Sequence, residues 1–190
     1  MAFTPASAGV FTNTVTLSNN SRSNGVFTFQ VIGTAVIAAA SNSLTGLEYT
    51  SIQAAVDAGT NNYSVLVYPG VWHEQVFVTN RSGLSLIAKV WLGGGDNTTT
   101  VLDGSALSNA GIYADQTTNL LVAGFTITGY TNGLYFINSR SNVVNQNRFL
   151  TNLATGVTLW TGAHWNAIVS NVAWGTNGGT AIYLDGASSN

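Results

Sequence analysis

The sequence predicts an all-β solenoid in which about 23 residues form one turn of three short strands. Short runs alternate apolar and polar residues, and beyond residue 62 similar segments recur every 22–24 residues. A unit of this length is too short for the four strands of a propeller blade and lacks helical periodicity. Three strands per turn, each pairing with the next turn about 4.8 Å away, satisfy the pattern.

The composition excludes several classes of protein. Charged residues make up 6% of the 190 residues, hydrophobic residues 45%, and cysteine is absent. The low charge argues against a disordered tail, and the formal net charge of −2 argues against a nucleic-acid partner. Without thiols there is no disulfide framework, cysteine-ligated zinc or cysteine nucleophile. The longest apolar run is too short for the about 20 residues of a membrane span.

Residues 1–37 are predicted to form a β-hairpin. Apolar and polar residues alternate from Phe11 to Leu17 and from Val26 to Ile32, and the SNNSRSNG segment between them has turn composition. Two strands alone are not a stable domain. The pattern FTPASAGVFTNTVTLSNN…FTFQVIGTAV resembles the last strands of the Ig-like modules of large bacterial surface proteins and of Hydin-type repeats, which implies a partial Ig-like module here.

Residues 38–48 are small and polar without a period, which predicts a linker. A short helix is predicted over residues 51–58, with Ser51 as its N-cap. The apolar residues that share one face of this helix are Ile52, Ala55 and Val56. We expect the helix to cover the open apolar end of the first turn, as solenoids require.

The repeat begins most clearly at four glycine or alanine positions, Gly111, Gly133, Gly156 and Ala181. One asparagine column is predicted to form a buried amide ladder that satisfies side-chain and backbone polar groups from turn to turn. Its predicted members are Asn119, Asn142, Asn166 and Asn190. Residues 89–97 (KVWLGGGDN) are predicted to be a loop inserted into one of the earlier, less regular turns.

The segment SIQAAVDAG, followed by VLVYPGVWHEQVFV, LSLIA and TTTVLDG, resembles the opening of the pectin-lyase-like superfamily of right-handed parallel β-helices. It is similar to the start of pectin methylesterases and of NosD-like periplasmic repeat proteins. The resemblance covers about residues 49–190 and implies the N-terminal turns of a right-handed parallel β-helix, interpreted as truncated, with a structural role for Glu74. It implies little about function, because this fold carries lyases, hydrolases, esterases and binding proteins.

Strand alternation predicts a stripe of outward-facing aromatic side chains and carboxylates on one sheet. Its first column contains Phe77, Tyr113, Tyr135, Thr158 and Tyr183, and the adjacent column contains Thr79, Asp115, Ile137, Trp160 and Asp185. The candidate carbohydrate-binding residues are Tyr113, Asp115, Tyr135, Trp160 and Tyr183. Aromatic rings contact the apolar faces of sugars, and carboxylates bind their hydroxyls. Alternatively, ring stacking stabilises the sheet, or a partner domain covers the stripe.

Whether the protein is an enzyme stays open; if it is one, we expect a polysaccharide lyase, glycoside hydrolase or carbohydrate esterase. The candidate catalytic residues are Asp103, Asp115 and Asp185. Asp115 and Asp185 are expected three turns apart, roughly 14 Å, beyond the about 5–9.5 Å that separates glycosidase carboxylates. Asp103 and Asp115 are free to approach each other. We expect no metal site and no cofactor; a Ca²⁺ ion is compatible with the composition, but no motif indicates it.

The sequence therefore predicts a secreted or cell-surface protein of bacterial type that binds polysaccharide, pectin-like or another extended glycan, along the aromatic stripe. Processing of that glycan stays open. The alternative is a non-catalytic structural or adhesive solenoid of a large bacterial surface protein. Unpaired strand edges at the open C-terminal turn predict self-association.

Overall fold

The structure, a computed structural model, describes residues 9–18, 26–105, 107, 109–175 and 179–190. The chain forms two compact units, residues 1–37 and residues 38–190. The boundary between the units coincides with the end of the predicted hairpin region.

The first unit is an antiparallel pair of strands, β1 (Gly9–Ser18) and β2 (Val26–Ala35), with Gly9 opposite Ala35 and Ser18 opposite Val26. This confirms the predicted hairpin; beyond Ser18, its predicted turn lies outside the described residues. Large apolar side chains are exposed along both strands, namely those of Val10, Leu17, Val26, Phe27, Phe29, Val31 and Ile32. The partial Ig-like module stays a prediction.

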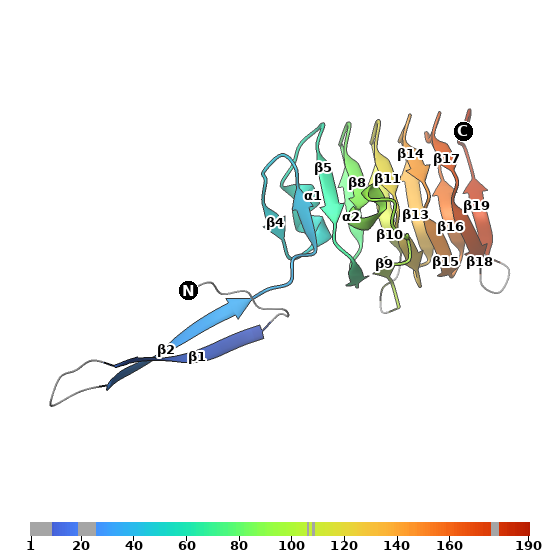
Figure 1. Cartoon of the computed structure of the whole chain (residues 1–190). Coiled ribbons are helices and arrows are strands. Elements are labelled where there is room, and N and C mark those ends of the chain that lie inside the picture. Colours follow the sequence, from blue (N-terminus) through green and yellow to red (C-terminus); the bar gives the residue numbers. More distant parts are fainter. Residues whose placement is uncertain (1–8, 19–25, 106, 108, 176–178) are drawn as a thin grey trace. The chain divides into compact units, whose positions relative to one another are not determined.

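The second unit is a solenoid whose parallel strands stack into three sheets (Figure 1). The first sheet contains β7 (Val76–Thr79), β10 (Ala110–Asp115), β13 (Asn132–Ile137), β16 (Thr155–Leu159) and β19 (Thr180–Leu184). The second contains β5 (Ser64–Val67), β8 (Ser85–Ala88), β11 (Leu121–Ala123), β14 (Val143–Asn145) and β17 (Ala167–Val169). The third contains β6 (Gly70–Trp72), β9 (Thr100–Asp103), β12 (Thr126–Thr128), β15 (Arg148–Asn152) and β18 (Val172–Gly175). The predicted solenoid is confirmed. The structure adds β6, which the sequence did not predict.

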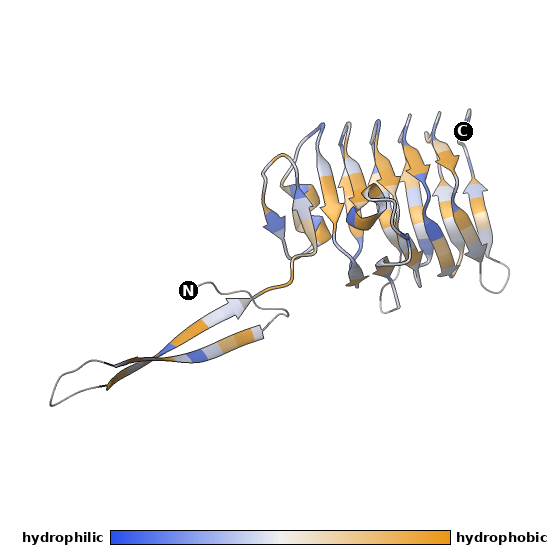
Figure 2. Ribbon diagram, in the orientation of Figure 1, coloured by the Kyte–Doolittle hydropathy of each residue, from blue (hydrophilic) through white to orange (hydrophobic). Residues whose placement is uncertain are grey.

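Buried and more exposed side chains alternate as predicted over the last four residues of β7, β10 and β13 in the first sheet. On β16 the alternation is interrupted, because Thr158, predicted to face outward, is buried. On β10, Ile112 and Ala114 are fully buried, whereas Tyr113 and Asp115 are partly exposed. Figure 2 shows apolar residues recurring along the stacked strands of the solenoid. On β19, the inward residue Ile182 is 45% exposed, because none of the described residues forms a further turn to cover it.

Within one turn of the solenoid, the three corner positions between strands are five residues apart. In one turn the three corner positions hold fully buried apolar side chains, those of Leu120, Phe125 and Tyr130. In the next turn the same positions hold Asn142, Asn147 and Asn152. Each of these asparagines accepts a hydrogen bond through Oδ1 from the backbone N–H of the apolar residue in the turn before it, at 2.8, 3.0 and 3.2 Å.

The first asparagine column continues toward the C-terminus as a ladder. Asn142 N and Nδ2 donate to Asn166 Oδ1 at 3.1 and 2.9 Å, and Asn166 N and Nδ2 donate to Asn190 Oδ1 at 2.8 and 3.1 Å. The placement of Asn119 in this ladder is wrong, because Leu120 occupies the ladder position in that turn. Asn119 precedes it, exposed and with φ +52°, a left-handed conformation that asparagine tolerates better than most residues.

A helix covers the N-terminal end of the solenoid, as predicted. This helix, α1 (Ile52–Asp57), starts after Ser51, whose Oγ accepts a hydrogen bond from Ala54 N at 3.1 Å. The two carboxylate oxygens of Glu74 accept from Ile52 N at 2.9 Å and from Gln53 N at 3.1 Å. Glu74 therefore caps the helix and places a negative charge at its positive end, which gives the implied structural role a physical basis.

The strand edges at this end are also covered. Gln53 substitutes for a neighbouring strand beside β7: Phe77 N donates to Gln53 Oε1 at 2.7 Å, and Gln53 Nε2 donates to Phe77 O at 3.1 Å. In the second sheet, β3 (Ala40–Asn42) pairs antiparallel with β5 and with β4 (Glu48–Tyr49). The linker predicted at residues 38–48 is therefore wrong, because pairing with β5 makes part of this small-residue segment a strand of the cap.

Candidate functional site

Five aromatic rings form one continuous column on the outer face of the first sheet, and we call them the aromatic column. In order along the solenoid they are Phe77, Tyr113, Tyr135, Trp160 and Tyr183. The strand register aligns four of the five, with Thr158 at the equivalent position on β16. The indole of Trp160, two residues after Thr158, takes the place of the missing ring.

The rings of the column pack on one another. Their centroids are 6.0, 5.7, 6.4 and 6.0 Å apart in order, and the planes of the last four rings differ by only 10–27° between neighbours. These distances exceed the strand spacing of about 4.8 Å, so the rings are offset rather than directly superposed. Each inner ring therefore has a neighbouring ring on both sides.

The two ends of the column are its most exposed rings. Phe77 is 44% exposed and Tyr183 40%, while the three rings between them are half-buried. Burial raises the pKa of the Tyr113 and Tyr135 hydroxyls. The charge of Asp115 raises the pKa of Tyr113 further, and the neighbouring Tyr113 and Asp185 raise that of Tyr135 further. Both phenols are consequently neutral hydrogen-bond donors at physiological pH.

Two of the predicted carboxylates lie beside the column. Asp115 accepts a hydrogen bond from Asn138 Nδ2 at 3.1 Å, and Asp185 is 3.5 Å from the hydroxyl of Tyr183. The strand register separates them by three turns, roughly 14 Å at 4.8 Å per turn. They are thus too far apart to act together as the acid and nucleophile or base of a glycosidase, which need about 5–9.5 Å.

The third candidate carboxylate, Asp103, lies on the third sheet, so the structure does not bring it to Asp115. Its Oδ2 is 3.2 Å from Ser105 Oγ and 3.6 Å from His73 Nδ1. The carboxylate thus stands between the hydroxyl and the imidazole. In a catalytic triad the histidine stands between the acid and the serine, because it takes the hydroxyl proton, so this cluster lacks the order that acyl transfer needs.

The inserted loop forms an arm that sequence reasoning did not connect to any site. It comprises α2 (Lys89–Leu92) and the segment up to residue 99, at the corner between the second and third sheets. Trp91 Nε1 donates to Gln146 Oε1 at 2.5 Å, and Asn97 Nδ2 donates to Gln146 O at 2.9 Å. Trp91 also packs directly on Gly124, where an added Cβ would lie 2.4 Å from the Trp91 Cβ.

Neither a metal-ion cluster nor a membrane-spanning helix occurs in the described part of the chain. There, no three histidine, aspartate or glutamate side chains gather closely enough to hold a metal ion, and Ca²⁺ binding stays untested. None of the helices in the same residues combines the length and apolarity that crossing a bilayer requires.

The comparison with protein families gives one match. The family model for the right handed beta helix region matches residues 74–190, which include every strand from β7 to β19. No curated protein and no solved structure matches the chain. The comparison therefore bears on the fold, while the pectin-lyase-like and Hydin-type resemblances stay predictions.

Proposed function

The chain belongs to the right handed beta helix family, and on that scaffold we propose that the aromatic column binds an extended polysaccharide. The observation that supports the proposal is the continuity of the five rings across five stacked strands. A straight row of equivalent groups is complementary to a polymer whose own units repeat. A flat sheet face also accepts a long chain without requiring a deep cleft.

The contacts we propose follow from the way the rings pack. Because the inner faces are shared between neighbours, a sugar would meet the outer edges of the rings, where the hydroxyls of Tyr113 and Tyr135 and the indole N–H of Trp160 donate hydrogen bonds. Asp115 and Asp185 would accept hydrogen bonds from sugar hydroxyls beside the column. The exposed terminal rings, those of Phe77 and Tyr183, supply the free apolar faces for C–H contacts.

Binding without cleavage is the step we propose for the described residues. Asp103 and Asp115 lie on separate strands, Asp185 directly follows a third, and the three have separate hydrogen-bond partners. We further propose a secreted or cell-surface location of bacterial type, supported by the absence of cysteine and a charged content of only 6%.

One observation favours the alternative of a structural or adhesive solenoid. Stacking of each inner ring between two neighbours is itself stabilising, by about 0.5–1.5 kcal/mol per aromatic pair beyond the area buried. If stabilisation is the whole role of the column, removing an inner ring lowers stability and leaves glycan retention unchanged.

The test is affinity electrophoresis through gels that contain a panel of polysaccharides. We expect Tyr135→Ala and Trp160→Ala to abolish retention, whereas Tyr135→Phe keeps the stack and loses only the hydroxyl contact. Trp165→Ala, which removes an exposed indole outside the column, is the matched control. Retention by no glycan, or equal retention of the parent protein and both alanine variants, would overturn the proposal. Release of reducing ends, or a rise in absorbance at 235 nm, would show that the protein cleaves the glycan as well as binding it.

A further inference from the structure

The arm forms one wall of an open pocket at the corner between the second and third sheets. Its volume is about 610 Å³, within the range of about 300–1,000 Å³ found for small-molecule sites. The pocket is lined by Trp91, Leu92, Gly94, Gly95, Asp96, Asn97, Gln146 and Ser170. Elsewhere this corner takes two residues, as at Gly124–Phe125, so the pocket exists only where the arm is inserted.

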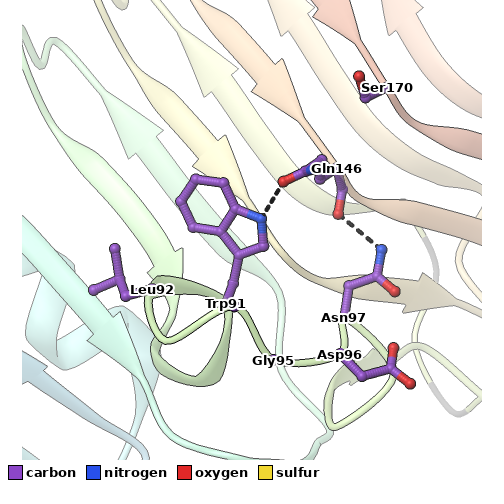
Figure 3. A pocket seen from close by; sticks show the side chains of 8 residues that line it. Trp91, Leu92, Gly95, Asp96, Asn97, Gln146 and Ser170 are labelled. Carbon is purple, nitrogen blue, oxygen red and sulfur yellow. Dashed lines mark hydrogen bonds between the residues drawn. The ribbon is translucent and has the colours of Figure 1, made fainter.

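The arm is held in place without a ligand. Figure 3 shows the Trp91 indole and the Asn97 amide directed toward Gln146, each with its hydrogen bond. A third bond joins the arm to β12, where Thr126 Oγ1 donates to Asn97 O at 2.8 Å. A pocket fixed in this way avoids most of the entropic cost of ordering a loop on binding.

The polar atoms left available in the pocket suit a polyol. Among the described residues no partner bonds to Gln146 Nε2 or to Ser170 Oγ, and Asp96 uses only Oδ1, which accepts from Thr98 N at 2.9 Å. These groups offer one amide donor, one hydroxyl and one carboxylate oxygen. Trp91 and Leu92 supply an apolar wall beside them. A ring with one apolar face and several hydroxyls matches this combination.

The charge of the pocket narrows the class of sugar. Asp96 is the one charged residue in its lining, and the arm's lysine, Lys89, instead places its Nζ 4.2 Å from the centre of the Tyr68 ring. A lone carboxylate repels uronic acids and phosphates and accepts hydrogen bonds from neutral hydroxyls. We infer that the Trp91 pocket binds a neutral sugar residue and discriminates against uronic acids.

This site is distinct from the aromatic column. The pocket lies at the corner of the second and third sheets, whereas the column lies on the outer face of the first sheet. The inference therefore goes beyond the proposed function, and each of the two sites can fail independently of the other.

The experiment measures affinity for defined oligosaccharides by isothermal titration calorimetry. The neutral probes are cellohexaose, mannohexaose and xylohexaose, and the acidic probe is a galacturonic acid hexamer. The test variant is Asp96→Asn/Ser170→Gly, which keeps the Oδ1 acceptor and suits the positive φ of Ser170. The matched control, Asp57→Asn/Ser141→Gly, makes the same chemical changes outside the pocket, and Ser141 also has a positive φ.

We expect at least one neutral hexasaccharide to bind, the acidic one not to bind, and the test variant to bind at least about tenfold more weakly than the control, because it loses a charge-assisted hydrogen bond. Equal affinities of the test and control variants would overturn the inference, as would binding of the acidic probe alone. Loss in the test variant with no effect of Tyr135→Ala would support the pocket and not the column. The converse would support the column and overturn the pocket, and no binding of any neutral probe would overturn the pocket outright.

Discussion

At the scale of single residues, the corner asparagines show how one side chain satisfies buried polar groups of neighbouring turns. Asn147 is fully buried; its Oδ1 accepts from Phe125 N, and its Nδ2 donates to Val122 O and to Asn171 Oδ1. The acceptor for the backbone N–H of Phe125 is thus a side chain of the next turn. The interior of the solenoid therefore couples adjacent turns through amides as well as through apolar contacts.

We predict that Asn147→Ala destabilises the protein by about 1–3 kcal/mol, the cost of leaving a buried N–H such as that of Phe125 without its acceptor. The free energy of unfolding is measured by urea denaturation. The control is Asn145→Ala, at a partly exposed position on β14, where we expect a change within about 0.5 kcal/mol. Equal losses in the two variants would contradict a specific role for the corner amide.

At the scale of elements, α1 is too short to be stable on its own, since isolated helices need about 12–15 residues. It is held by the burial of Ile52 and by hydrogen bonds from its free N–H groups to Ser51 and Glu74. Glu74 is 21–22 residues away in sequence, so the cap and the first turn stabilise each other.

We predict that Glu74→Ala costs about 1–2 kcal/mol and increases hydrogen exchange at the Ile52 and Gln53 amides, because both lose their acceptor. Glu48→Ala removes an exposed carboxylate from β4 and serves as the control. Exchange by mass spectrometry or NMR reports on the helix directly. Unchanged protection of the two amides in Glu74→Ala would show that the carboxylate does not hold the helix.

The regular strands could be predicted from the sequence, whereas two irregular ones could not. Strands from residue 110 onward repeat in register, so each turn supports the assignment of the next. The strands β3 and β6 lack that support: the small residues around Ala40 and the Pro69–Gly70 pair are poor strand signals. They are extended because β5 and β9 pair with them, which is a tertiary effect.

At the scale of the whole molecule, one part of the candidate site could be predicted from the sequence and another part could not. Period-two alternation placed Tyr113, Tyr135 and Tyr183 on the outer face, and their register follows from the repeat. The closure of the column by Trp160 depends on side-chain packing that no period encodes. The contact of Trp91 with Gln146 spans 55 residues and an irregular insertion, so the sequence pattern carried no signal for it.

The two ends of the solenoid differ, and the difference predicts association. At the N-terminal end α1, Gln53 and β3 cover the apolar core and two of the strand edges, as described above. At the other end the edges of β17, β18 and β19 have no partner among the described residues, and large apolar side chains are exposed there. They include Val172 at 39%, Trp174 at 72%, Ile182 at 45% and Leu184 at 55%. Unpaired edges of this kind recruit strands of other chains.

We predict that the 190-residue protein associates through this C-terminal turn, with a mass by light scattering that rises with concentration. Contact between two C-terminal ends is favoured, because α1 blocks stacking of one molecule's C-terminal turn on the N-terminal end of another. Ile182→Asp places a charge on the exposed edge and should shift the protein toward the monomer. Ile32→Asp, on the hairpin, is the matched control, since Ile32 is also exposed. A monomer at every concentration would contradict the prediction, and association abolished only by Ile32→Asp would place the contact on the hairpin instead.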